Sequence, residues 1–232
     1  MNNRFRRRYR CGLLVCLWLA TGITVAEAQQ TTRPVTRRTP PPSQGVEIGG
    51  YAMVGRIDFS ATESFDAILD THAGPVVGGG ARLGLPWFGL FAEIGAWRFR
   101  ADGERAFVHN GTRFPLGIDT TITVTPIEVS GGWRWRMRRV PRLTPYVAGG
   151  ITSLRYEETS DFADANENVD ENFAGYLVYG GAAYKITRWL GIAGEAAWST
   201  VPDAIGDAGV SAAFKETNLG GTALRLKITV GR

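Results

Sequence analysis

Eight charged residues lie in segments where polar and apolar residues alternate, and we assign all eight to the polar face. They are Arg56, Arg82, Glu93, Glu128, Arg134, Glu195, Arg225 and Lys227. A buried charge without a partner is costly, so we expect the glutamates to be clamped by the basic side chains in an internal network. The alternative chemistry for this set is a gated ion or proton path. Both readings stay open, because residue types alone do not give the cross-strand register.

A second cluster is the acidic stretch 157–171, which has seven acidic residues and no Lys or Arg. Within it, oxygen-bearing side chains recur at alternate positions, as in the first half of a calcium loop: Asp164, Asn166, Asn168 and Asp170. Val169 stands where such a loop needs glycine, and Gly175 where it needs glutamate. We therefore predict a solvated loop with no resident metal, suited to bridging lipopolysaccharide through divalent ions, and keep a cation site as the alternative.

Enzymatic chemistry has little support in the sequence. The two histidines, His72 and His109, fall in predicted loops without a strand-borne serine and acid nearby. Both cysteines, Cys11 and Cys16, lie in the leader described below, and the glycine run 78–80 lies inside a strand and opens no helix. The sequence predicts a non-catalytic protein without a cofactor.

The elements that must position these residues are strands, because alternation with a period of two recurs after residue 45 and no useful amphipathic helix is found. Eight segments are expected: Val46–Phe59, Val76–Leu85, Phe88–Phe99, Thr121–Arg136, Pro145–Tyr156, Phe173–Ile186, Trp189–Ser199 and Leu219–Val230. Such lengths can cross a bilayer at a tilt. The sequence therefore favours an all-β protein.

One face of each segment is apolar and is expected to face lipid. The clearest case is 121–136, where Ile127, Val129, Trp133 and Trp135 oppose Glu128, Ser130, Arg134 and Arg136. In the first segment we assign Tyr51, Met53, Ile57 and Phe59 to the lipid face, and in the fifth Tyr146, Ala148, Leu154 and Tyr156.

The connections alternate in length along the chain. Short links fall at 86–87, 137–144 and 187–188, whereas long polar links fall near 60–75, 100–120, 157–172 and 200–218. A meander across a membrane has this regularity, with short turns on one side and long loops on the other.

Aromatic residues gather near the short links, as expected for rings at the level of lipid headgroups. This predicted girdle consists of Trp87, Phe88, Trp133, Trp135, Tyr146 and Trp189. A second girdle toward the long loops would hold Trp97, Tyr156 and Trp198.

With its alternating strands, its short and long links and strings such as TPIEVSGGWRW (125–135) and TPYVAGG (144–150), the chain resembles small outer-membrane β-barrels of the OmpA/OmpX type. The resemblance covers roughly residues 46–232. It implies a closed antiparallel up-and-down barrel, a monomer, in contact with outer-membrane lipid and lipopolysaccharide and inserted by the barrel-assembly machinery. The chain ends in Arg232, where such proteins usually have an aromatic residue.

The first residues have the pattern of a secretory signal peptide. A basic segment, MNNRFRRRYR, precedes an apolar core and the Ala26-Glu27-Ala28 cleavage pattern. We therefore divide the chain into a signal peptide (1–28), a flexible linker rich in Pro and Arg (29–45) and the barrel (46–232). The predicted location is the outer membrane of a Gram-negative-type cell.

Net charge gives no sign of a nucleic-acid partner. The formal net charge of +4 belongs to residues 1–28, which hold five arginines and one acid, and the rest of the chain sums to zero. A hydrophobic content of 44% is too high for a disordered chain. We expect an envelope or surface-interaction protein with a charge-plugged lumen. A narrow pore for small or hydrophobic molecules and a soluble ligand-holding barrel are the alternatives.

Overall fold

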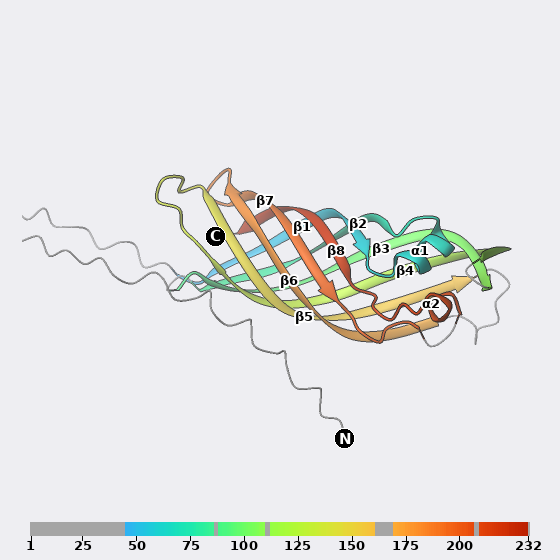
Figure 1. The fold of residues 1–232 in the computed structure, drawn as a ribbon. Coiled ribbons are helices and arrows are strands. Elements are labelled where there is room, and N and C mark those ends of the chain that lie inside the picture. The colour runs from blue at the N-terminus through green and yellow to red at the C-terminus, as the bar shows by residue number, and fades with distance from the viewer. Residues whose placement is uncertain (1–44, 86–87, 110–111, 161–168, 207–208, 232) are drawn as a thin grey trace, which may run out of the picture. The chain divides into compact units, whose positions relative to one another are not determined.

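The computed structural model describes residues 45–85, 88–109, 112–160, 169–206 and 209–231. Eight strands dominate it (Figure 1). They are β1 (Glu47–Phe59), β2 (Ala73–Leu85), β3 (Leu90–His109), β4 (Thr112–Arg134), β5 (Leu143–Ser160), β6 (Val169–Lys185), β7 (Leu190–Thr200) and β8 (Gly221–Gly231). The predicted signal peptide and nearly all of the predicted linker lie outside the described residues.

The strands form one closed barrel in chain order, in which every neighbouring pair is antiparallel. Closure comes from β1 and β8, which pair from Gly49 opposite Gly231 to Phe59 opposite Gly221. A closed barrel leaves no free sheet edge along its paired length. The prediction of an eight-stranded antiparallel barrel is confirmed.

The two ends of the barrel differ in how the strands are joined. At the short-turn end, compact links join β2 to β3, β4 to β5 and β6 to β7; the opposite, long-loop end carries α1 (Thr62–Leu69) and α2 (Gly209–Phe214) (Figure 1). The sequence pattern predicts no helix here. These helices are only eight and six residues long, too short to display a reliable period of 3.6 residues.

In two of the predicted long loops, the flanking strands extend into the loop. The β3–β4 hairpin continues in paired register to His109 opposite Thr112, and the β5–β6 hairpin to Glu158 opposite Val169. Both hairpins run on past the ends of β2 and β7 (Figure 1). The β5–β6 extension is mostly polar, and the β3–β4 extension mixes charged residues with exposed apolar ones such as Phe107 and Leu116. The alternation that marked the barrel walls is therefore lost, although the backbone pairing persists.

Side chains on the outer surface of the barrel wall are mostly apolar. Along β8 the outward positions are Leu224, Leu226, Ile228 and Val230, and the Leu226 side chain is 65% exposed. The inward positions of the same strand include Arg225 and Lys227, both buried. This polarity is the reverse of a soluble protein, in which charges face water. No helix among the described residues is long and apolar enough to cross a membrane.

Candidate functional site

The centre of the lumen holds a cluster of six charged side chains, which we call the lumen cluster. It consists of Arg82, Glu93, Glu128, Glu195, Arg225 and Lys227. Two of its pairs lie directly opposite each other across strands, Arg82 with Glu93 and Glu195 with Arg225. The strand register thus brings together charges that lie far apart in the chain.

Lys227 links two of the carboxylates. Its Nζ lies 2.6 Å from Glu93 Oε1 and 2.8 Å from Glu195 Oε2, and the residue is only 1% exposed. The ammonium also lies over two aromatic rings, 4.4 Å from the Tyr51 centroid and 5.2 Å from that of Tyr179. Ring faces attract a desolvated cation, so they add to the ion pairs.

Arg225 holds the third carboxylate in a two-pronged contact. Its Nη1 and Nη2 donate to Glu128 Oε2 and Oε1 at 2.8 and 2.7 Å, and Nη1 lies 3.5 Å from Glu195 Oε1. Trp97 Nε1 donates to the same Glu128 at 2.7 Å. Paired guanidinium and carboxylate groups in this arrangement form strong, directional hydrogen bonds.

Arg82 completes the cluster toward the short-turn end. Its Nε donates to Glu93 Oε2 at 2.8 Å, and its guanidinium lies 4.7 Å from the Phe91 ring centroid and 4.9 Å from that of Tyr146. Tyr146 in turn donates its hydroxyl to Glu195 Oε2 at 3.1 Å. Three carboxylates therefore face three cations, and the ionised side chains of the cluster balance to zero.

All eight strands contribute a side chain at this level of the barrel. Besides the charged residues of β2, β3, β4, β7 and β8, the lumen receives Tyr51 from β1, Tyr146 from β5 and Tyr179 from β6. An eight-stranded barrel is just wide enough for side chains to fill it. The cluster and its aromatic neighbours can therefore act as a cross-section of packed, paired side chains.

An apolar layer closes the lumen at the long-loop end. Phe65 of α1 is 3% exposed and stacks on Phe59 with ring centroids 4.3 Å apart, and Phe99 meets Phe59 edge-on at 5.0 Å. The first turn of α1 is held by Glu216, whose Oε2 accepts a hydrogen bond from the Ser64 backbone N–H at 2.8 Å. The carboxylate satisfies a free N–H of the helix start and complements its dipole. We call α1 with this layer the lid.

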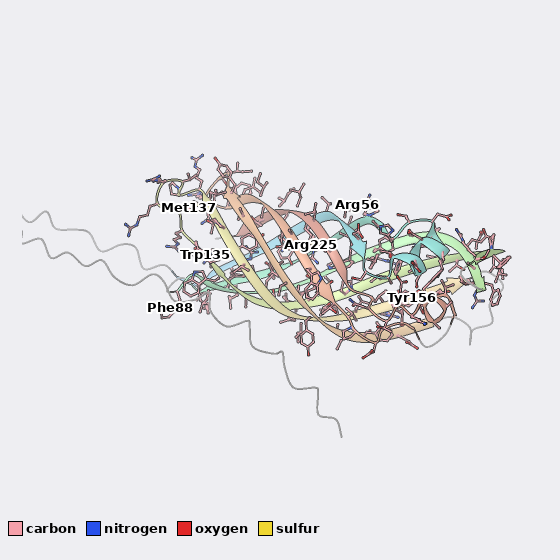
Figure 2. The ribbon with its side chains drawn as sticks, viewed as in Figure 1. Arg56, Phe88, Trp135, Met137, Tyr156 and Arg225 are labelled. Atoms are coloured by element: carbon pink, nitrogen blue, oxygen red, sulfur yellow. The ribbon has the colours of Figure 1, made fainter. Side chains whose placement is uncertain are left out.

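Arg134 and Arg56, the other two residues of the predicted network, lie elsewhere. Arg134 points inward but sits at the short-turn end, where it pairs with Glu47. Arg56 is exposed on the outer surface, so its assignment to the lumen was wrong. It lies three residues from the end of β1. This position is toward the long-loop end (Figure 2), where a long stem can lie on apolar surface while the guanidinium reaches water.

The sides assigned to lipid and to the lumen were also wrong in two strands, β1 and β5. Tyr51, Met53, Ile57 and Phe59 of β1 face the lumen, as do Tyr146, Ala148, Leu154 and Tyr156 of β5. In β1 the outward residues Ile48 and Val54 are apolar as well, so hydrophobicity alone did not distinguish the two faces. Tyr146 is therefore not a girdle residue, because its ring and hydroxyl serve the lumen cluster.

Four predicted girdle residues are exposed on the outside near the short turns: Phe88, Trp133, Trp135 and Trp189. Phe88 and Trp135 lie at the end of the barrel opposite Tyr156 (Figure 2). Trp87 lies outside the described residues. Of the second girdle, Trp198 is exposed, whereas Trp97 and Tyr156 are buried and face inward. The expectation for these two was wrong, since Trp97 is needed as a donor to Glu128.

The weak calcium-loop pattern receives no support from its one described member. Asp164, Asn166 and Asn168 lie outside the described residues, while Asp170 belongs to β6. Arg155 donates two hydrogen bonds to Asp170, at 2.8 and 2.7 Å. These bonds hold the pKa of the Asp170 carboxyl below its usual range. Among the described residues, no group of three or more His, Cys, Asp or Glu is placed to hold a metal ion.

His72, one of the two histidines, is bound by carboxylates. Its Nδ1 lies 2.9 Å from Asp66 Oδ1 and its Nε2 lies 3.7 Å from Asp58 Oδ1. Hydroxyl nucleophiles are not among the described contacts of this ring. The side chain of His109 is not described.

The aromatic enclosure of the cluster, the Glu216 contact and the Glu47–Arg134 pair are features that the sequence analysis missed. Glu47 has the same parity in β1 as Tyr51, which the sequence had assigned to the lipid face, so its parity pointed away from the lumen. The Glu216 contact joins residues more than 150 positions apart, and no local pattern marks it.

The geometry defines a class of protein: a small, eight-stranded barrel with an apolar outside and a charged, filled lumen. Solved structures with this fold include Neisserial surface protein A, with 12% sequence identity and a TM-score of 0.50 over 81% of this chain and 97% of that one. A major outer membrane protein from Thermus thermophilus is similar at 12% identity and a TM-score of 0.50, over 82% and 100%. At this identity the likeness concerns the fold, which is that of small outer-membrane β-barrels. No family model and no curated protein matches the sequence.

Proposed function

We propose that the protein is a non-catalytic, non-conducting outer-membrane barrel that serves as a rigid platform for its long-loop end. The observation that carries this proposal is the filled lumen. A permeating ion would have to break buried pairs such as Arg225–Glu128 or Lys227–Glu195, and breaking one leaves an uncompensated charge in a medium of low dielectric constant. A permeating ion would also have to pass the apolar side chains of the lid.

The outward apolar surface supports the membrane location. Under this proposal the belt contacts outer-membrane lipid, the exposed aromatic rings near the short turns lie at the periplasmic headgroup level, and the long-loop end is extracellular. Lipopolysaccharide then surrounds the β5–β6 hairpin, and the barrel-assembly machinery inserts the chain. A soluble ligand-holding barrel would need the opposite polarity on its outer wall.

Planar-bilayer conductance tests the proposal. The refolded mature barrel is expected to leave the bilayer silent at applied voltages that give clear steps with a known open porin. Incorporation is verified by heat-modifiable gel migration of the same preparation in vesicles. Discrete open steps that disappear when the protein is omitted would contradict a sealed lumen and favour the alternative of a narrow pore.

A second measurement tests the location separately. Fractionation of expressing cells is expected to place the mature chain with outer-membrane vesicles. Recovery in the soluble periplasmic fraction without detergent would contradict the membrane assignment, whatever the conductance result.

A further inference from the structure

The short-turn end of the lumen opens into a cavity of about 330 Å³. Residues of every strand except β3 line it, with outward-facing Ile48 and Val230 at its rim and Arg82 of the lumen cluster in its wall. The cavity is therefore the vestibule of the barrel on the side that the lid does not cover. Its volume falls at the lower end of sites for small molecules and is about ten times the share of one water in liquid.

Charges in the vestibule are not balanced. Deeper in the lumen each carboxylate has a matching cation, but in the vestibule Glu47 is the only acid among the lining residues, against Arg82, Arg134, Lys185 and Arg188. Arg82 is already committed to Glu93. Three cations are thus left with one carboxylate.

Arg134 is the best-placed of these cations. Its side chain is 14% exposed and donates through Nη1 to Glu47, while Nε and Nη2 have no hydrogen-bond partner within the described part of the chain. Lys185, also a lining residue, makes no ion pair within that part. A guanidinium with unmatched N–H groups beside an ammonium is suited to a phosphate or carboxylate, whose oxygens accept several hydrogen bonds at once.

Glycine at position 84 leaves room for this arrangement. A Cβ atom there would lie 2.6 Å from Arg134 Nη2 and 3.2 Å from the Cβ of Glu47. Any side chain would therefore displace the guanidinium from its position in the vestibule. The backbone at this point of β2 helps to set where the positive charge lies.

We propose that the vestibule binds a small anion carrying a phosphate or carboxylate group, held by Arg134 and Lys185. The size of the cavity limits the ligand to a small molecule or a single lipid headgroup. These two sources share the same chemistry and are distinguished by the experiment below.

The test is isothermal titration calorimetry of the refolded full barrel in a non-ionic detergent, with pyrophosphate as the probe and ionic strength held constant with sodium chloride. We expect saturable binding at one site, and at least tenfold weaker binding in the double variant Arg134→Gln/Lys185→Gln. Arg100→Gln, which removes an exposed cation beyond β2 on the long-loop side of β3, is the matched control and is expected to bind like the wild type. Heat-modifiable migration establishes that each variant is folded.

Absence of saturable binding, or equal affinity in the double variant, would overturn the proposal. A double variant that fails to fold is replaced by Lys185→Gln alone, which removes an exposed side chain and is expected to weaken binding at least threefold. The same titration in nanodiscs then separates the sources. Weaker apparent binding in discs of anionic lipid than in discs of zwitterionic lipid identifies a headgroup as the occupant, and equal binding identifies a free solute. Both outcomes support the site.

Discussion

Replacing Arg225 with methionine tests whether charge balance holds the lumen cluster together. The Arg225 side chain is 3% exposed, and its guanidinium donates to both oxygens of Glu128 and approaches Glu195. Methionine keeps much of the apolar stem but leaves three carboxylates facing two cations. Removing one partner of a buried ion pair costs about 3–5 kcal/mol. We expect the free energy of unfolding to fall by that amount.

A second substitution should recover part of the loss. Adding Glu128→Gln to Arg225→Met returns the cluster to two carboxylates and two cations, and the amide oxygen can still accept the hydrogen bond from Trp97 Nε1. The remaining loss in the free energy of unfolding, relative to the wild type, is the difference between charged and neutral hydrogen bonds, about 1–2 kcal/mol. The double variant should therefore be more stable than Arg225→Met alone, although it carries one more change.

Equilibrium unfolding in urea, with the barrel refolded in lipid vesicles, measures these differences. Tryptophan fluorescence and heat-modifiable gel migration report the folded fraction independently, so a two-state transition can be checked. Arg100→Gln, at an exposed site, is the control and should leave the midpoint unchanged. A cost below about 1 kcal/mol for Arg225→Met, the range of exposed ion pairs, would refute the reasoning. So would a double variant less stable than the single one.

Three other expectations follow from the same structure. Leu226→Arg, at the middle outward position of β8, should lower the free energy of unfolding in lipid by about 2–4 kcal/mol, and Val230→Arg near the strand end by about 0–1 kcal/mol. Urea unfolding in vesicles measures both, and equal losses would contradict a lipid-facing wall. Phe65→Ala should destabilise the lid by about 3–5 kcal/mol and speed amide exchange in α1, and unchanged protection would argue against a packed lid. Because the pKa of Asp170 is lowered, its pair with Arg155 should persist above the ordinary carboxyl pKa and break as the pH falls through the lowered one. Arg155→Gln should raise the Asp170 midpoint in a carboxyl NMR titration, and an unmoved midpoint would contradict the pairing.

The barrel was predictable because its wall has an apolar outer face toward lipid and a polar inner face toward the lumen. Over 127–134 of β4 and 224–230 of β8 one face is apolar and the other carries charge, so hydrophobicity assigns the faces and chain order assigns the neighbours. In β1 both faces are apolar at several positions, and Arg56 was the wrong marker of the inward face. A charge near a strand end can lie outside at the interface, so it says less about sidedness than Glu195 or Arg225 in mid-strand.

The residues of the lumen cluster could be predicted from the sequence, but their ion-pair partners could not. Residue type and parity select Glu93, Glu128 and Glu195, whereas their partners depend on the stagger between strands, which a period of two leaves undetermined. The role of Tyr146 was hidden for a related reason. A tyrosine is chemically suited to a headgroup girdle and to a hydrogen bond with a buried carboxylate, and only the position of Glu195 decides between them.

The two ends of the barrel should act independently, and the lumen cluster is the reason. Basic Arg134 and Lys185 face the vestibule, while acidic Glu157 and Asp170 lie on the β5–β6 hairpin at the other end. Between them lies a neutral layer of paired side chains that presents no net charge to either end. Exposed charges farther apart than about 8–10 Å are largely screened at physiological salt. Binding of an anion in the vestibule should therefore leave the Asp170 titration unchanged, and a shift on binding would mean that the cluster rearranges rather than acting as a fixed plug.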